Sequence, residues 1–147
     1  MPHVTGVRHI KANRRGGKLF AALIAVCGVA GTGQAAERPA PDYYLDALID
    51  TTTAQQLALS CPTLSVNLPR VAQATGDVIA RLEEDGFTMT AEQTGMEDAT
   101  DALASRQDAF VTKYGLQNPS ADAVCAAGRA EIQEGTVMGS YLIEVSG

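Results

Sequence analysis

The stretch CAAGRAEIQEGTVMGSYL, residues 125–142, decides the fold of this chain. Six of its residues follow one another at alternating intervals of three and four, which places them on one face of an α-helix. They are Cys125, Gly128, Ile132, Gly135, Gly139 and Leu142. Each glycine inside a helix costs about 0.8–1 kcal/mol of helix propensity, so three of them need a compensating interaction. Close approach of a second helix is the simplest one, and we expect a tight helix crossing on this face.

Charged residues within the stretch favour a crossing in a soluble domain. Gly135 and Gly139 form a G-x-x-x-G motif, which joins membrane helices only within a long apolar segment. Arg129, Glu131 and Glu134 interrupt this segment. We expect Arg129 to form a buried pair with a carboxylate of the neighbouring helix, and Glu131 to lie beside the small-residue face, so that both help to fix the crossing. Catalysis by Arg129 and Glu131 is the alternative, and we favour the structural role over it.

Two further helical patterns lie upstream. The first begins after Asp42, a candidate N-cap, and ends near Cys61. The second needs Pro69 in its first turn and ends at Gly86. Its apolar seam has the spacing 4, 3, 4, 3, 4 and consists of Leu64, Leu68, Val71, Thr75, Val78 and Leu82.

A third helical pattern opens with a capping box, Thr90 and Gln93, and closes at Gly115. The fourth helix carries the deciding stretch and begins with Asn118 as its N-cap and Pro119 at its first position. The sequence therefore predicts an all-α fold, a compact bundle of about four helices. The core positions expected on the third helix are Met96, Ala99, Leu103 and Phe110.

The first thirty-six residues have the order of a secretory signal peptide. Residues 1–18 contain five basic residues and no acidic one, residues 19–30 are an unbroken apolar run, and residues 31–36 are small and weakly polar. We expect cleavage after Ala35 or Ala36. The predicted organisation is a signal peptide over 1–36, an extended tether over 37–42 and a single helical domain over 43–147.

Three other interpretations of this segment match its residues less well. The apolar run has twelve residues, whereas a membrane-spanning helix needs about 20. Arg14 and Arg15 would suggest twin-arginine export, but Gly-Gly-Lys follows where that signal carries an aromatic residue and leucine. Cys27 follows a valine, not the small residue that a lipoprotein signal places there. We therefore expect Sec-type export to the periplasm, or onward to the exterior, with no membrane span after cleavage.

Removing the signal leaves a strongly acidic domain. The whole chain has a formal net charge of −6, from 11 basic and 17 acidic residues. All the acidic residues lie after residue 36 with only six of the basic ones, so the domain carries −11. Such a charge repels nucleic acid and anionic membranes and attracts a basic protein face. His3 and His9 both leave with the signal, which excludes imidazole catalysis and histidine metal sites.

Two cysteines remain in the domain, Cys61 and Cys125. An even number of cysteines in an exported chain indicates one disulfide. In the chain-entropy model, closing a loop of this length stabilises the fold by about 4 kcal/mol. A redox pair or a metal-binding thiol pair is the alternative, but the spacing is not C-x-x-C and no third ligand accompanies it.

Cys61-Pro62 and the run C-x-x-G-R-x-E-I-x-x-G-x-x-x-G from Cys125 to Gly139 resemble an uncharacterised alphaproteobacterial secreted family, the domain of unknown function 5333. The resemblance spans about residues 43–142. It implies a periplasmic helical domain with paired cysteines, and it supplies no activity.

The remaining candidate chemistry is that of carboxylates. Glu97, Asp98 and Asp101 could hold a cation such as calcium, but no loop of alternating oxygen ligands accompanies them. We therefore expect a non-enzymatic periplasmic accessory or partner-binding module, without a cofactor or metal, whose protein partner presents a basic face. One alternative is an acid-stress chaperone, because −11 becomes about +6 once the carboxylates are protonated. The other is a carboxylate-based metal-binding protein or small hydrolase.

Overall fold

The computed structural model describes residues 37–88 and 95–146. These residues belong to one compact unit, Gly33–Gly147. The predicted signal peptide and the predicted capping box of Thr90 and Gln93 lie outside the described residues. In chain order the described elements are α1 (Asp42–Ser60), β1 (Leu64–Val66), α2 (Leu68–Glu84), α3 (Thr100–Tyr114), α4 (Ala121–Glu134), α5 (Val137–Ser140) and β2 (Leu142–Glu144).

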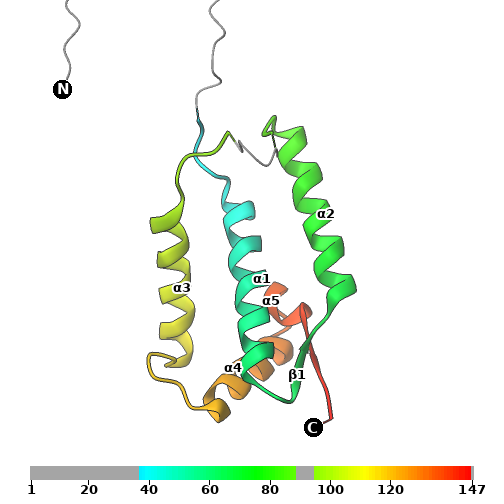
Figure 1. The fold of residues 1–147 in the computed structure, drawn as a ribbon, viewed down its shortest axis with the longest axis vertical. Helices are drawn as coiled ribbons and strands as arrows, with labels where there is room; N and C mark the ends of the chain where they lie inside the picture. Colours follow the sequence, from blue (N-terminus) through cyan, green and yellow to red (C-terminus); the bar gives the residue numbers. More distant parts are fainter. Residues whose placement is uncertain (1–36, 89–94, 147) are drawn as a thin grey trace, which may run out of the picture. The chain divides into compact units, whose positions relative to one another are not determined.

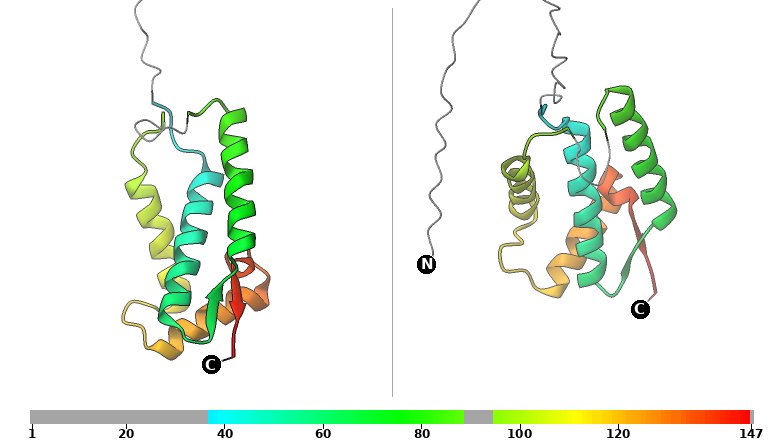
Figure 2. Two further views of the ribbon diagram at one scale, coloured as in Figure 1. Left: turned by 45° about the vertical axis from the view of Figure 1, so that its right-hand side comes forward. Right: turned by 45° about the horizontal axis from the view of Figure 1, so that its top comes forward.

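Helix α1 is the central element. Figures 1 and 2 show it between α3 and α2, with α4 crossing near its C-terminal end. It contacts α2, α3, α4, α5 and β1, whereas α2 and α3 pack mainly against α1 alone. Leu45, Thr53, Ala54 and Leu57 form its buried positions. The mostly helical fold confirms the predicted class, and the two strands are an addition that the all-α prediction lacked.

The core lies where the C-terminal half of α1 meets α4, α5 and the two strands. Leu57 and Cys61 meet Cys125 and Leu142 there, and Phe110 joins them from α3. Helix α2 contributes less to the buried interior, because Leu82 is its only fully buried residue. Most of the apolar burial that stabilises the domain is therefore concentrated at one end of α1.

The predicted fourth helix is not continuous to Leu142. Gly135 ends α4 in the left-handed conformation with φ +66°, which glycine adopts at little cost. Thr136 then begins the short helix α5, because its hydroxyl accepts a hydrogen bond from the Gly139 amide at 2.9 Å. The G-x-x-x-G motif therefore spans a helix end and a new helix start. It is not one face of one helix, and that prediction was wrong.

Leu64 and Leu142, which the sequence assigned to helices, lie in a two-stranded antiparallel sheet. Strand β1 pairs with β2 in the register Leu64↔Glu144 and Val66↔Leu142. Asn67 then caps α2 by accepting a hydrogen bond from the Arg70 amide at 3.3 Å. Because an N-cap residue has a non-helical backbone, the seam of α2 starts after Leu64.

Three predicted helix starts shift along the chain. Pro41 is the N-cap of α1, so Asp42 is the first helical residue and interacts favourably with the helix dipole. Helix α3 begins at Thr100, which donates its amide hydrogen to the Asp98 carboxylate at 2.9 Å. Met96 and Ala99 thus precede the helix. Helix α4 begins after Ser120, not after Asn118, and the Ser120 hydroxyl accepts a hydrogen bond from the Ala123 amide at 3.2 Å.

Two predicted helix ends are confirmed. Gly86, at φ +77°, follows α2, and the Phe87 amide donates a hydrogen bond to the Leu82 carbonyl. Gly115 ends α3 in the left-handed conformation. Helix ends were easier to predict than helix starts, because a C-terminal glycine has a specific backbone role.

The predicted tether is extended but is attached to the domain. The Arg38 amide donates a hydrogen bond to the Gly95 carbonyl, and the Glu97 amide donates one to the Arg38 carbonyl. The Arg38 guanidinium also lies 3.8 Å from the centre of the Phe87 ring. Within the described ranges, no helix combines the length and apolar character needed to cross a bilayer.

Candidate functional site

A groove with a volume of about 300 Å³ lies between α1 and α2. Residues of α1 between Tyr44 and Gln55 form one wall, and residues of α2 between Ala74 and Leu82 form the other. Tyr141, which follows α5, completes the lining. We refer to this feature as the α1–α2 groove.

The α1–α2 groove is lined without a single charged side chain. Thr52 and Thr75 hydrogen-bond to carbonyls of their own helices, Leu48 and Val71 respectively. Tyr141 is different, because only 2% of the residue is exposed and its hydroxyl makes no hydrogen bond within the described residues. Among the described residues, every fully enclosed side-chain nitrogen or oxygen has a hydrogen-bond partner. Because the Tyr141 hydroxyl has none, it is not fully enclosed and is accessible from open space.

Asp50 lies on α1 near Tyr141 and is half-buried. Its burial, together with the charges of Asp46 and Glu131, raises its pKa to about 6. Burial and the Asp50 charge in turn raise the pKa of the Tyr141 hydroxyl. The positive charge of Arg70 opposes this rise, so the Asp50 and Arg70 charges act on the Tyr141 hydroxyl in opposite directions.

Glu131 is the most buried carboxylate, with 5% of its side chain exposed, and it joins three elements. It accepts hydrogen bonds from Lys113 at 3.0 Å and Tyr114 at 2.5 Å, both on α3, and from the Thr136 hydroxyl. Burial alone would raise its pKa, but the hydrogen bonds from Thr136, Tyr114 and Lys113 outweigh it and lower the pKa. Lys113 also bonds Glu134 at 2.8 Å. This arrangement satisfies the carboxylate structurally and leaves no reactive group free.

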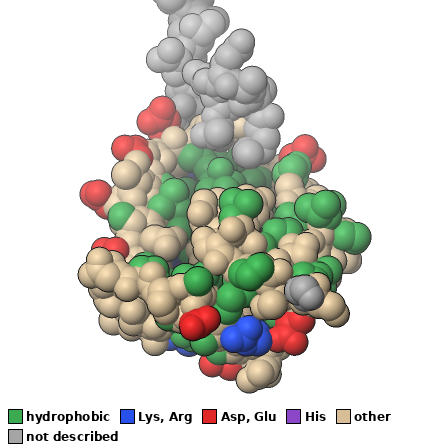
Figure 3. Space-filling model, turned by 60° about the horizontal axis from the view of Figure 1, so that its bottom comes forward, with side chains coloured by type: hydrophobic (Ala, Val, Ile, Leu, Met, Phe, Trp, Pro, Cys, Tyr) green, Lys and Arg blue, Asp and Glu red, His purple; other side chains and the backbone are tan. Residues whose placement is uncertain are grey.

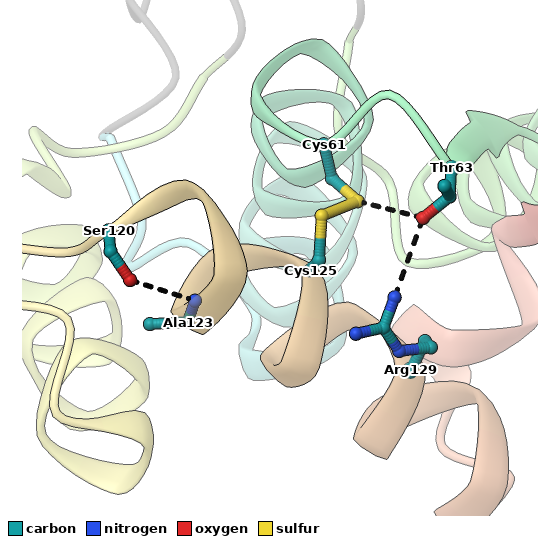
Figure 4. The surroundings of a disulfide bond; sticks show 6 residues. All are labelled: Cys61, Thr63, Ser120, Ala123, Cys125 and Arg129. Atoms are coloured by element: carbon teal, nitrogen blue, oxygen red, sulfur yellow. Dashed lines mark hydrogen bonds between the residues drawn. A yellow bond between two sulfur atoms is a disulfide. The ribbon is translucent and has the colours of Figure 1, made fainter. Parts of the chain in front are cut away.

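Arg129 does not form the predicted pair with a carboxylate. Its guanidinium donates a hydrogen bond to the Thr63 hydroxyl at 3.4 Å, next to the disulfide (Figure 4). The ion pair that ties α4 to its neighbour is instead that of Glu131 with Lys113. Lys113 lies in the last turn of α3, and no sequence signal linked it to Glu131.

The disulfide between Cys61 and Cys125 is confirmed, with an S–S distance of 2.01 Å. It joins the C-terminal end of α1 to α4 (Figure 4). Thr63 lies beside it, with its hydroxyl 3.3 Å from the Cys61 sulfur. Both cysteines are buried, so the bond is part of the core.

The three glycines predicted for a helix crossing have different surroundings. A Cβ on Gly128 would lie 2.4 Å from a methyl carbon of Leu64, so β1 approaches α4 closely at this point. A Cβ on Gly139 would lie 2.1 Å from the Glu131 carbonyl oxygen, so α5 folds back tightly on α4. Gly135 has open space around it and serves as the helix end. The close approaches involve a strand and a short helix, where a long helix was expected.

Every basic side chain of the predicted mature domain has a partner within the domain. Arg106 pairs with Asp42 at 2.7 Å and Asp46 at 2.8 Å, and Lys113 pairs with glutamates. The other four contact aromatic rings or polar groups: Arg38 with Phe87, Arg81 with Tyr43, Arg70 with Gln73 and Arg129 with Thr63. Across residues 37–88 and 95–146, no three histidine, cysteine or acidic side chains gather as metal ligands.

The profile of the family of unknown function DUF5333 matches residues 40–143. The chain belongs to this family. The matched region of this DUF5333 protein contains α1 to α5, both cysteines and the whole α1–α2 groove. No curated protein and no solved structure matches the chain.

Sequence analysis of the DUF5333 chain did not find the α1–α2 groove. The seam of α2 was identified, and Val71 does pack against the core, but the spacing did not show that Val78 and Leu82 line a groove. A usable signal was present, because that seam includes Thr75, which a fully covered helix face would seldom use. Tyr141 was missed because it lay beyond the predicted helix face.

Proposed function

We propose that this chain is a non-enzymatic accessory or partner-binding protein of the bacterial periplasm. It would be exported through a Sec-type signal peptide, as the resemblance to an alphaproteobacterial secreted family implies. Its protein partner would present a basic face. The disulfide in the core supports an oxidising compartment, since such bonds persist where thiols are not kept reduced.

Uncompensated surface charge is the observation that carries this proposal. All six basic side chains after residue 36 contact groups of the same domain, whereas many acidic ones have no partner within the described residues. In the face drawn in Figure 3, red acidic side chains stand along the edge, and the blue basic group in view lies beside red ones. Glu83 and Glu84 on α2 and Asp101 and Asp108 on α3 are exposed examples. An acidic surface of this kind steers and binds a basic partner.

The experiment compares two charge reversals of equal size in the full chain, expressed in a bacterial host and cross-linked in the periplasm. One variant carries Glu83→Lys and Glu84→Lys, and the other carries Asp101→Lys and Asp108→Lys. We expect a cross-linked basic protein with the wild type at 50 mM salt. Its yield should fall strongly at 500 mM salt and in the variant whose helix faces the partner.

The matched variant on the other helix should retain the partner and so controls for folding. Recovery of the same protein at both salt concentrations and from both variants would contradict the proposal. Failure to recover any basic protein would contradict it as well. Intact mass spectrometry of the released chain tests the export part, with an N-terminus at Ala36 or Glu37 and a mass two hydrogens below the dithiol.

An acid-stress chaperone is the second candidate, and the Glu131 contacts favour it. Protonating this carboxylate would remove the ion pair with Lys113 that holds α3 to α4. Because its pKa is lowered, this loss would come only in strong acid. Prevention of client aggregation at pH 2–3 by the wild type would support the candidate. Cooperative folding without such activity at that pH would rule it out.

A further inference from the structure

Helix α2 leaves much of its apolar side uncovered. It runs over seventeen residues and is strongly amphipathic, yet it packs mainly on α1 and fully buries Leu82 alone. Val78 is half-buried and Ile79 is 39% exposed, and both line the α1–α2 groove. A helix with this pattern normally covers its apolar stripe against a second surface. The groove is therefore a place where additional apolar contact is available.

The dimensions of the groove suit a short apolar chain. Its volume of about 300 Å³ lies at the lower limit of sites that bind small molecules. Along α1 it extends from Tyr44 to Gln55, which corresponds to roughly 16 Å at the helical rise. A linear chain of about eight to ten carbons is shorter than this length and fits a site of this volume.

The charge of the lining selects the kind of ligand. Transfer of an ion to an apolar site without a counter-charge is costly, and no charged side chain lines the groove. Near Tyr141 the charges of Asp50 and Arg70 oppose each other, so a charged head group of either sign would meet one like charge. The acidic residues that would recognise a basic peptide lie elsewhere, on the exposed sides of α2 and α3. A neutral molecule fits this lining best.

Tyr141 supplies the polar contact. Only 2% of Tyr141 is exposed, and its hydroxyl has no hydrogen-bond partner within the described residues but is accessible from open space. A ligand oxygen at the groove end would satisfy it. We propose that the α1–α2 groove binds a neutral amphiphile, an apolar chain with one oxygen head group, and that the head group hydrogen-bonds to the Tyr141 hydroxyl.

Calorimetric titration with 1-octanol tests this proposal. The protein used is the chain purified from the expressing cells with its disulfide intact. Octanoate and octylammonium are compared as charged head groups of the same chain length. We expect octanol to bind more tightly than either ion. Ala47→Leu, which fills the groove from α1, should abolish the heat of binding, while the circular dichroism spectrum stays unchanged.

A pair of tyrosine variants separates the hydroxyl contact from a structural effect. Tyr141→Phe should weaken octanol binding about three- to tenfold, the usual contribution of one hydrogen bond, and leave stability to urea unchanged because no intramolecular bond is lost. Tyr114→Phe removes the hydroxyl that bonds Glu131, so it should lower stability and leave octanol binding unchanged. The two variants thus have opposite expected outcomes.

Four results would overturn the proposal. They are no octanol binding at millimolar concentration, equal affinity in Tyr141→Phe, tighter binding of either charged analogue, or a dimer in sedimentation that Ala47→Leu converts to monomer. The last result would mean that a second copy occupies the groove. None of them bears on the acidic faces of α2 and α3, so the basic partner remains a separate question.

Discussion

The two ends of α1 are held to their neighbours by different kinds of interaction. At the disulfide end, Cys61 is bonded to Cys125 and surrounded by the apolar side chains of β1, α4 and α5. At the other end, which we call the stacked end, Arg81 lies 3.9 Å from the centre of the Tyr43 ring and Arg38 lies 3.8 Å from that of Phe87. One end has a disulfide inside the main core cluster, and the other has exposed arginine side chains stacked on Tyr43 and on the buried Phe87 ring.

This difference predicts an uneven distribution of stability. Apolar burial and a cross-link each contribute several kcal/mol, whereas an exposed cation–π contact contributes about 0.5–1 kcal/mol. We therefore expect the stacked end to open locally more often than the disulfide end. The α1–α2 groove extends from Tyr44 near the stacked end, so its entrance lies where local opening is least costly.

Removal of the disulfide should have the largest effect on this comparison. The bond closes a loop between residues 64 positions apart, and its loss should lower the free energy of unfolding by about 4 kcal/mol. Urea unfolding of Cys61→Ala/Cys125→Ala measures this value, with the reduced wild type as a second preparation. A loss below about 1 kcal/mol would mean that packing alone holds this end together.

Glycine substitutions compare the tight and the open parts of the molecule directly. Gly139→Ala would place a methyl carbon 2.1 Å from the Glu131 carbonyl oxygen, so we expect a loss of about 3 kcal/mol. Gly76 lies inside α2 with open space around it, and Gly76→Ala should stabilise the protein by about 0.5–1 kcal/mol. Thermal unfolding gives both values, and a similar change in the two variants would contradict the tight fold-back of α5.

The fate of the 125–142 stretch shows what the sequence could and could not predict. Its spacing correctly indicated small residues at close contacts, and the contacts exist at Gly128 and Gly139. Periodicity alone could not show that Gly135 adopts a left-handed conformation, because three glycines at helical spacing fit either a continuous helix or a helix, a turn and a second helix. The Thr136 hydroxyl decides between them, because it caps α5 by accepting a hydrogen bond from the Gly139 amide.

The disulfide was predictable and the candidate groove was not, for a physical reason. The domain has two cysteines, which allow one intramolecular pairing, so their number alone gives the answer. A groove depends on how far two helices diverge, which results from what fills the space between them. Here Tyr141 enters that space after a turn that the sequence pattern did not reveal.

Asp50 lies on α1 between the two ends, and its ionisation should make the stability of the protein depend on pH. Its pKa is raised to about 6, so its charged form is disfavoured in the folded state. Its contribution to stability is complete below its ordinary pKa of 3.8 and is lost as the pH rises through about 6. Asp50→Asn should therefore stabilise the protein at pH 7.5 by about 1–2 kcal/mol, after allowing for solvent screening.

The same variant should make little difference at pH 3, where the carboxyl is mostly protonated in both the folded and the unfolded chain. Urea unfolding at both pH values measures the contrast. The facing groups that could alter it are Asp46, Glu131 and Tyr141. A loss of stability in Asp50→Asn at pH 7.5 would show that the carboxylate has a stabilising partner there.

Arg38→Ala should have the smallest effect and define the stacked end most sharply. The substitution removes the contact with Phe87 and the hydrogen bond to the Asp85 carbonyl, so we expect a loss of about 1 kcal/mol. Hydrogen exchange should accelerate at the amides of Glu97 and Phe87, which hydrogen-bond at this end, and stay unchanged around Cys125. Arg70→Ala serves as the control, because it also removes an arginine, whose side chain hydrogen-bonds Gln73 on the same helix. Equal acceleration at both ends would mean that α1 transmits the loss along its whole length, and that the two ends are one cooperative unit.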